Sequence, residues 1–184
     1  MPNDFEHYRP YLMLLAQVQL DPRLAAKIDA SDIVQQTMAE AHQTAADFRG
    51  TSDAELAGWL RRILAHNLAD ALRCLRRDKR DVGRERSLEE RLSESSQRLQ
   101  HWLIADQTSP SQHAQRQERA VRLAQALAQL SAPQRDAIVL QYWHGWSLAQ
   151  IGQKLDRSTA AVAGLLRRGL SQLRQTLDKQ GVDL

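Results

Sequence analysis

Small side chains and arginines lie together in the last part of the sequence that shows helical periodicity. Residues 158–164 read Ser-Thr-Ala-Ala-Val-Ala-Gly, and three arginines follow within the next ten positions. Short side chains let a helix approach the edges of DNA bases, and arginine reaches either a phosphate or a guanine. The residue types therefore predict a helix that contacts DNA. Its candidate contacts are Ser158, Thr159, Ala160, Ala161, Arg167 and Arg168.

A helix-turn-helix is the element that would present this face to DNA. Ser147 and Gln150 form a capping box that begins a short helix over residues 148–155, residues 156–158 make a turn, and a final helix runs over residues 159–177. Gly152 would let the two helices approach closely. Apolar residues occupy the positions where they cross: Leu148, Ile151, Leu155, Val162 and Leu166. A generic helical hairpin, or a face that packs on another protein, would show the same spacing, so both alternatives stay open.

A second basic face belongs to a predicted helix in the N-terminal half. Ser52 and Glu55 form its capping box, and apolar residues recur every three or four positions over residues 56–75. A basic helix with a nearby aromatic residue, here Trp59, holds a nucleic-acid strand through phosphate contacts and base stacking. Core packing is the first interpretation of Trp59, and a solvated face is the usual one for a row of arginines. The face of this helix that lies opposite the apolar positions carries Arg61, Arg62, His66, Arg73, Arg76 and Arg77.

The remaining periodic segments complete an all-α fold. We predict helices over residues 8–18, 23–28 and 32–48, the third capped by Ser31. Ser131 and Gln134 begin another helix, which stops at Gly145. The outer face of residues 32–48 is polar and net acidic, with Asp32, Gln35, Gln36, Glu40 and Gln43.

The domain organisation follows from a weak pattern in the middle of the chain. We expect one small helical domain over residues 1–82, a linker over residues 83–115, and a helix-turn-helix domain of winged-helix-like type over residues 116–184. In the linker, Ser87 and Glu90 could cap a short helix that ends near Trp102. The expected fold is therefore two small helical domains on a tether.

Composition argues against several classes of protein. No apolar run approaches the ~18 residues of a membrane span, and the N-terminus lacks a signal peptide, so we expect a cytoplasmic protein without a membrane partner. The six histidines are scattered, with no helical metal pair, and the sequence has no glycine-rich phosphate loop or nucleophile elbow. We therefore expect no enzyme, no metal and no cofactor.

Two blocks of the sequence resemble the extracytoplasmic-function sigma factors of bacterial RNA polymerase, a group of the sigma-70 family. Asp32-Ile-Val-Gln-Gln-Thr37, Phe48-Arg-Gly50 and Trp59-Leu-Arg-Arg-Ile-Leu-Ala-His-Asn67, followed by Leu72-Arg73, are similar to region two of that family. Leu130-Ser-Ala-Pro-Gln-Arg-Asp-Ala-Ile-Val-Leu140 and Ser147-Leu-Ala-Gln-Ile-Gly-Gln-Lys-Leu155 are similar to region four. The pair, in this order and at this separation, is more specific than a helix-turn-helix alone.

The resemblance implies a subunit that binds core RNA polymerase and directs promoter-specific transcription initiation. Asp32, Gln35 and Gln36 would dock on the clamp helices of the largest subunit, and the C-terminal domain would meet the flap of the second subunit. The N-terminal domain would read the −10 element of promoter DNA, and the recognition helix the −35 element. An anti-sigma factor is a further candidate partner. The residues implied for the unpaired non-template strand of the −10 element are Arg49, Arg62, His66, Asn67, Arg73, Arg76 and Arg77.

Two departures from the family pattern limit what is carried over. Many relatives have lysine or arginine where this chain has Ala163 and Leu165, so readout of the upstream element would rest on Arg167 and Arg168. The linker is also more helical in pattern than a minimal spacer, and would pack on its own domains or on a regulator. The alternative function is an autonomous helix-turn-helix transcriptional regulator, which co-purification with core polymerase would distinguish from a sigma factor.

Overall fold

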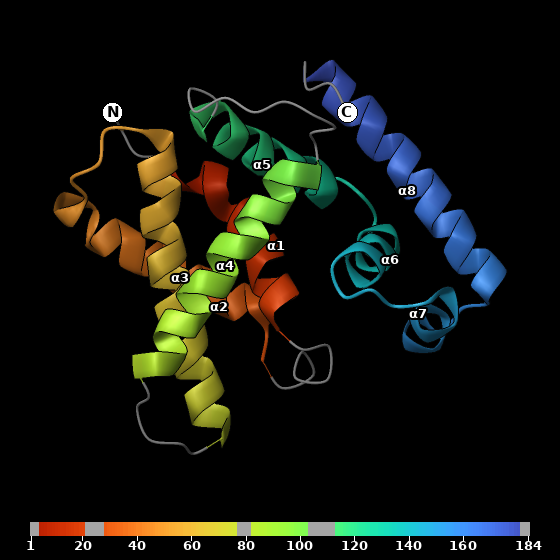
Figure 1. Ribbon diagram of the computed structural model, residues 1–184, viewed down its shortest axis with the longest axis horizontal. Coiled ribbons are helices and arrows are strands. Elements are labelled where there is room, and N and C mark those ends of the chain that lie inside the picture. Colours follow the sequence, from red (N-terminus) through yellow and green to blue (C-terminus); the bar gives the residue numbers. More distant parts are fainter. Residues whose placement is uncertain (1–3, 21–27, 77–81, 103–112, 181–184) are drawn as a thin grey trace. The chain divides into compact units, whose positions relative to one another are not determined.

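Helices make up nearly all of the part of the chain that the computed structural model describes, which is residues 4–20, 28–76, 82–102 and 113–180 (Figure 1). The predicted all-α class is confirmed, and no β-strand occurs in these ranges. None of the helices in them is long and apolar enough to cross a membrane. The elements are η1 (Phe5–Tyr8), α1 (Arg9–Gln19), α2 (Ala30–Gln43), η2 (Ala45–Asp47), α3 (Asp53–Arg76), α4 (Val82–Trp102), α5 (His113–Ala128), α6 (Ala132–Tyr142), α7 (Leu148–Leu155) and α8 (Thr159–Lys179).

The chain divides into two compact units, residues 1–121 and residues 122–184. In the first unit α1, α2 and α3 contact one another along the apolar stripes that the sequence shows. Leu60, Leu64 and Leu68 of α3 are fully buried, as are Leu12 and Leu15 of α1. Each such side chain contributes about 1.5 to 3 kcal/mol when it leaves water, so this seam holds the unit together.

α4 occupies most of the segment that the sequence predicts to be a linker. It packs on α1 and on α3 within the first unit, and Leu88 and Leu92 are buried in that contact. Residues 82–102 are therefore a structural part of the N-terminal unit. The predicted short helix ending near Trp102 exists, but it begins at Val82, before the predicted cap at Ser87.

The predicted bounds of α2 are wrong at both ends. Asp29 caps the helix, because its carboxylate accepts a hydrogen bond from the backbone N–H of Ser31 at 2.8 Å. At the other end α2 stops at Gln43, and η2 carries the chain on toward Phe48. The predicted helix over residues 23–28 falls almost entirely outside the described residues.

The second unit contains the predicted helix-turn-helix. The hydroxyl of Ser147 accepts from the backbone N–H of Gln150 at 3.3 Å and begins α7, and Asp156 closes it in the left-handed region at φ 54°. The hydroxyl of Ser158 then accepts from the backbone N–H of Ala161 at 3.2 Å and begins α8. Of the predicted crossing residues, Ile151, Val162 and Leu166 are buried and Leu148 and Leu155 are half-buried.

Gly152 is required where the turn folds back on α7. A Cβ atom there would lie 2.6 Å from the backbone oxygen of Arg157, and the Arg157 N–H already donates to the Gly152 carbonyl at 2.9 Å. The backbone of Arg157 cannot move away without opening the turn, so no residue with a side chain fits in place of Gly152. The close approach predicted at this glycine is confirmed.

We expect Gly152→Ala to destabilise the second unit by about 1 to 3 kcal/mol, because overpacking forces the turn away from α7. Gly164→Ala in α8 is the matched control. Its Cβ would meet only the flexible Arg168 guanidinium, at 3.2 Å, and alanine favours a helix by roughly 0.5 to 1 kcal/mol over glycine. Urea unfolding of both full-length variants measures the difference, and equal midpoints would contradict the steric argument.

Candidate nucleic-acid interface

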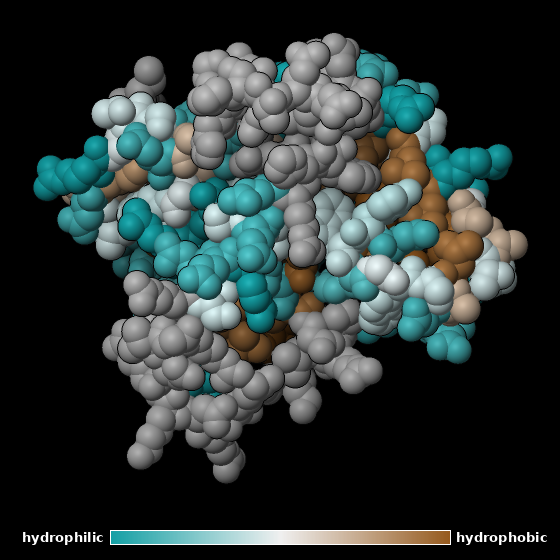
Figure 2. Space-filling view, in the orientation of Figure 1, coloured by the Kyte–Doolittle hydropathy of each residue, from teal (hydrophilic) through white to brown (hydrophobic). Residues whose placement is uncertain are grey.

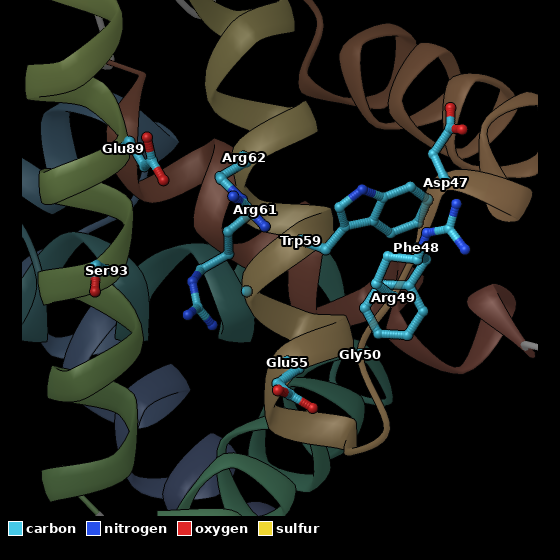
Figure 3. A pocket seen from close by; sticks show the side chains of 11 residues that line it. Asp47, Phe48, Arg49, Gly50, Glu55, Trp59, Arg61, Arg62, Glu89 and Ser93 are labelled. Atoms are coloured by element: carbon cyan, nitrogen blue, oxygen red, sulfur yellow. The ribbon is translucent and has the colours of Figure 1, made fainter.

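A pocket of about 590 Å³ lies beside the first turns of α3 (Figure 3). Three elements supply its walls: the segment from η2 to α3, α3 itself, and α4. The lining residues are Asp47, Phe48, Arg49, Gly50, Glu55, Gly58, Trp59, Arg61, Arg62, Glu89 and Ser93.

Glu55 fixes the loop that forms one rim of this pocket. Its carboxylate accepts from the backbone N–H groups of Thr51 and Ser52 at 2.8 and 3.1 Å, and from the Ser52 hydroxyl at 2.9 Å. The Glu55 N–H in turn donates to the Ser52 hydroxyl at 3.3 Å, so the predicted capping box is confirmed. These hydrogen bonds, that of the Thr51 N–H first, lower the pKa of Glu55. Its carboxylate is therefore occupied in holding the loop.

An aromatic pair forms another part of the pocket wall. The rings of Phe48 and Trp59 have centroids 5.4 Å apart and are tilted by 40°, and Trp59 also contacts the buried ring of Phe5 at 5.9 Å. Gly50 leaves room for this arrangement, since a Cβ atom there would lie 2.4 Å from Cζ of Phe48. Trp59 is half-buried, so it takes part in packing, as its position on the apolar stripe predicts, and also lines the pocket, where an aromatic face can stack on a base.

The arginines around the pocket differ in how free they are. Arg49 and Arg62 are exposed and line the pocket. Arg61, expected on the open basic face, is half-buried and donates to the Tyr11 hydroxyl at 2.9 Å and to Oε1 of Gln117 at 3.3 Å. Arg61 therefore helps to hold the helices of the N-terminal unit together. Arg49 and Arg62 are the better candidates for contacts with DNA.

Asn67 does not lie on the surface, although the family resemblance implies it as a DNA contact. Only 3% of the residue is exposed, and its side-chain amide donates to the Thr37 hydroxyl and to a Glu40 carboxylate oxygen, both at 3.2 Å. These bonds tie α3 to α2. Its role in the described structure is to join two helices, and it is not available to a strand outside.

The other candidates on α3 extend away from the pocket. His66 lies 3.6 Å from the carboxylate of Asp70, which also pairs with Arg73. The pocket lining includes neither His66 nor Arg73. The side chain of Arg76, and Arg77 entirely, lie outside the described residues.

Two further surfaces carry predicted contacts. On α2, Asp32, Gln35 and Gln36 are all exposed, while the opposite side of the helix is buried. On α8, Ser158, Thr159, Ala160, Arg167 and Arg168 are exposed and Ala161 is half-buried. Figure 2 shows pale residues of intermediate hydropathy around the N-terminal end of α8, as expected for alanine, serine, threonine and glycine.

Among the described residues, no three His, Cys, Asp or Glu side chains gather as a metal site would require.

Sequence reasoning missed the contribution of α4 to the pocket. Glu89 and Ser93 lie on a segment that the sequence assigns to a linker, and no motif marks them. The one available signal was the spacing of Leu88 and Leu92, which predicts a buried face on a helix and so places the residues that follow them beside it.

Comparisons with known proteins match both halves of the chain to one family. Residues 5–78 match the family model described as sigma-70 region 2, and residues 120–173 match that of sigma-70, region 4. The chain is 34% identical over 164 residues to the ECF RNA polymerase sigma factor SigG of Mycobacterium tuberculosis, a match that covers 84% of this chain and 43% of SigG. It is 43% identical over 60 residues to SigL of the same species, covering 33% of this chain and 34% of SigL.

The chain thus spans less than half of the length of these curated relatives. Among solved structures, it is similar to the sigma factor RpoE of Bartonella quintana, crystallised with the anti-sigma factor NepR. The identity is 19%, over 95% of this chain and 94% of that one, with a TM-score of 0.35.

We expect Asn67→Asp to destabilise the N-terminal unit by roughly 1 to 3 kcal/mol, because a second carboxylate would face Glu40 and the donated hydrogen bonds would be lost. His66→Asn, at a half-exposed neighbour on the same helix, is the control and should unfold like the parent. Urea unfolding of the full chain checks both. An Asn67→Asp variant as stable as the parent would show that the buried amide does not join the helices.

Proposed function

The chain belongs to the extracytoplasmic-function sigma factors of the sigma-70 family, and on that premise we propose that it binds core RNA polymerase and directs transcription initiation at specific promoters. It acts as a dissociable, non-catalytic subunit. The observation that carries this proposal is the occurrence of a region-2 match and a region-4 match on one chain, in that order.

In this proposal the pocket beside α3 holds an unpaired base of the non-template strand of the −10 element. Flipping a base out of its stack costs a few kcal/mol. Stacking on an aromatic side chain returns about 1 to 3 kcal/mol per base, and Phe48 and Trp59 line the pocket. Arg49 and Arg62 are exposed at the same pocket and would neutralise phosphates of the strand.

The N-terminal half of α8 reads the −35 element. Ser158, Thr159 and Ala160 are exposed and short, so this end of the helix can lie deep in the major groove. Ala163 is exposed and Leu165 half-buried, and neither can donate a hydrogen bond to a base. Arg167 and Arg168 are therefore the long side chains that carry base or phosphate contacts.

The exposed polar face of α2, with Asp32, Gln35 and Gln36, docks on the clamp helices of the largest polymerase subunit, and the C-terminal unit docks on the flap of the second. An autonomous helix-turn-helix regulator is the weaker alternative. Such a protein has no need of a region-2 domain, which here accounts for residues 5–78.

Co-purification tests the two functions against each other. A sigma factor should elute with core RNA polymerase and support transcription from a subset of genomic promoters in a purified system. An autonomous regulator should instead bind duplex DNA tightly by itself. Failure of the purified full chain to associate with core polymerase would overturn the proposed function.

We expect the double change Gln35→Ala and Gln36→Ala to weaken binding to core polymerase, because both amides lie on the docking face and neither is buried. Truncation of exposed residues should leave the unfolding midpoint unchanged. Gln97→Ala, an exposed glutamine on α4, is the matched control. Competition with labelled parent for core polymerase measures the effect, and a double variant that competes as well as the parent would place the docking face elsewhere.

We expect Arg167→Ala to cost about 1 to 3 kcal/mol in binding of the holoenzyme to its preferred upstream element if Arg167 reads a base, with relaxed selectivity at one position. If Arg167 contacts a phosphate, the loss should be the same for all sequences. Lys179→Ala removes an equal charge twelve residues further along α8, about 18 Å away, and should have little effect. Unchanged affinity and footprint for Arg167→Ala would remove this residue from the interface.

A further inference from the structure

Arg61 is a half-buried cation whose hydrogen-bond partners are both neutral. Within the described residues its hydrogen bonds leave from Nη1, to the Tyr11 hydroxyl at 2.9 Å and to Oε1 of Gln117 at 3.3 Å, and no carboxylate there forms an ion pair with it. We propose that Arg61 completes a phosphate site, in which its Nη2 binds a phosphodiester of the unpaired promoter strand over Gly58. This inference rests on the proposed function and adds a contact to the same pocket.

The two bonds from Nη1 fix the direction of the rest of the guanidinium group. Tyr11 is fully buried and Gln117 is 2% exposed, so they hold one edge of the planar group against the interior. Arg61 lines the pocket and extends from α3 toward α4, away from Asp47 and Arg49 (Figure 3). Because the fold already orders this side chain, it has less conformational freedom to lose when an anion binds.

Gly58 leaves open space directly beside Nη2 of Arg61. In the described structure a Cβ atom at position 58 would lie 3.6 Å from Nη2, with no other atom within 4 Å beyond the local backbone and chain neighbours. That distance is ordinary van der Waals contact, so alanine would fit, unlike at Gly50 or Gly152. Glycine inside a helix lowers stability relative to alanine, and one common reason for it is the close approach of a ligand to the backbone. The packing of the protein does not require Gly58, whereas a ligand would.

The order of side chains around α3 places Gly58 on the path of the strand. At 3.6 residues per turn, Gly58 lies between Trp59 on one side and Arg61 on the other, with Arg62 beside it. A strand whose base stacks on Trp59 therefore crosses Gly58 when its backbone reaches Arg61. Guanidinium groups bind phosphate oxygens through strong charge-assisted hydrogen bonds, and such contacts position a strand without reading its sequence.

The charges nearest to Gly58 favour an anion. Arg62 is exposed and lines the same pocket, so two guanidinium groups flank the open space. The carboxylate of Glu55 turns back to the loop before α3, where Thr51 and other donors hold it. Glu89 faces the site from α4 but is exposed, and water and salt screen an exposed charge.

Gly58→Ala separates this site from the fold, because it should raise stability and lower binding. Alanine should raise the urea midpoint of the full chain, while its methyl group occupies the space beside Nη2. The probe is a single strand with the non-template sequence of a promoter found in the transcription assay. We expect holoenzyme with Gly58→Ala to bind it about tenfold more weakly, as for the loss of one charge-assisted hydrogen bond.

The salt dependence identifies the lost contact as a phosphate. The slope of log affinity against log salt should become shallower by roughly 0.7, the value for one phosphate of a single strand. Gly164→Ala, the same change in the middle of α8, is the control. It should raise the urea midpoint as well and bind the single strand like the parent.

Strands in which one phosphate at a time is replaced by a neutral methylphosphonate locate the partner of Arg61. With parent holoenzyme, neutralising the linkage that lies over Gly58 should weaken binding. With Gly58→Ala holoenzyme, the same replacement should have no further effect, because the contact is already lost.

The outcomes separate this inference from the proposed function. Weaker binding, a shallower slope and a raised midpoint for Gly58→Ala support the phosphate site. If holoenzyme binds the strand but Gly58→Ala keeps the parent's affinity and slope, if its urea midpoint falls, or if no linkage depends on position 58, the site is overturned and the sigma-factor function stands. If the full chain forms no holoenzyme, both are overturned.

Discussion

The hydroxyl of Tyr11 is the point on which the arrangement of the N-terminal unit depends. It is fully buried, accepts a hydrogen bond from Arg61 of α3 at 2.9 Å, and donates one to Ser96 of α4 at 2.7 Å. A buried hydroxyl without a partner costs roughly 1 to 3 kcal/mol, so α1, α3 and α4 must keep the places that satisfy it. Those places leave the pocket open between α3 and α4, and they turn one arginine of α3 away from solvent. The pocket is thus a consequence of how three helices share one polar contact.

Local hydrogen bonds at helix ends organise the surfaces that the core leaves open. Ser52 with Glu55, Ser131 with Gln134, and Ser147 with Gln150 use the same exchange of backbone and side-chain bonds. In the N-terminal unit this exchange holds the loop at the pocket rim. In the C-terminal unit this exchange begins α7. The turn that follows α7 then sets the residue at which α8 starts. The loop at the pocket rim and the start of the recognition helix are therefore fixed by contacts within a few residues, whereas the packing between helices brings α4 to the same pocket.

That difference in range explains what the sequence could predict. The helix-turn-helix was predictable because its caps, its turn and its crossing residues lie within residues 147–166. Asn67, which only the family resemblance implies as a DNA contact, lies one turn after Leu64 on the buried stripe of α3. Its partners Thr37 and Glu40 are about thirty residues away in the sequence, so no local pattern indicates its hydrogen bonds. Gly83 and the serines at positions 93, 95 and 96 predict a linker, although Ser95 and Ser96 lie on the buried face of α4 and hydrogen-bond to α1. The pocket itself joins side chains from three segments, and no single segment carries its pattern.

The serines on the buried face of α4 have a physical consequence beyond the loss of a sequence signal. A seam of leucines alone tolerates a shift along the helix axis, since apolar contacts have little directional preference. Hydroxyls do not: moving α4 by one turn would displace Ser95 and Ser96 by about 5.4 Å and leave the Tyr11 hydroxyl and the Gln19 amide without those partners. Each such bond adds only about 1 kcal/mol to stability. These bonds therefore fix the position of α4 along its axis more than they raise the stability of the unit. Glu89 and Ser93, which line the pocket, lie on the same helix, so these hydrogen bonds also fix where α4 meets the pocket.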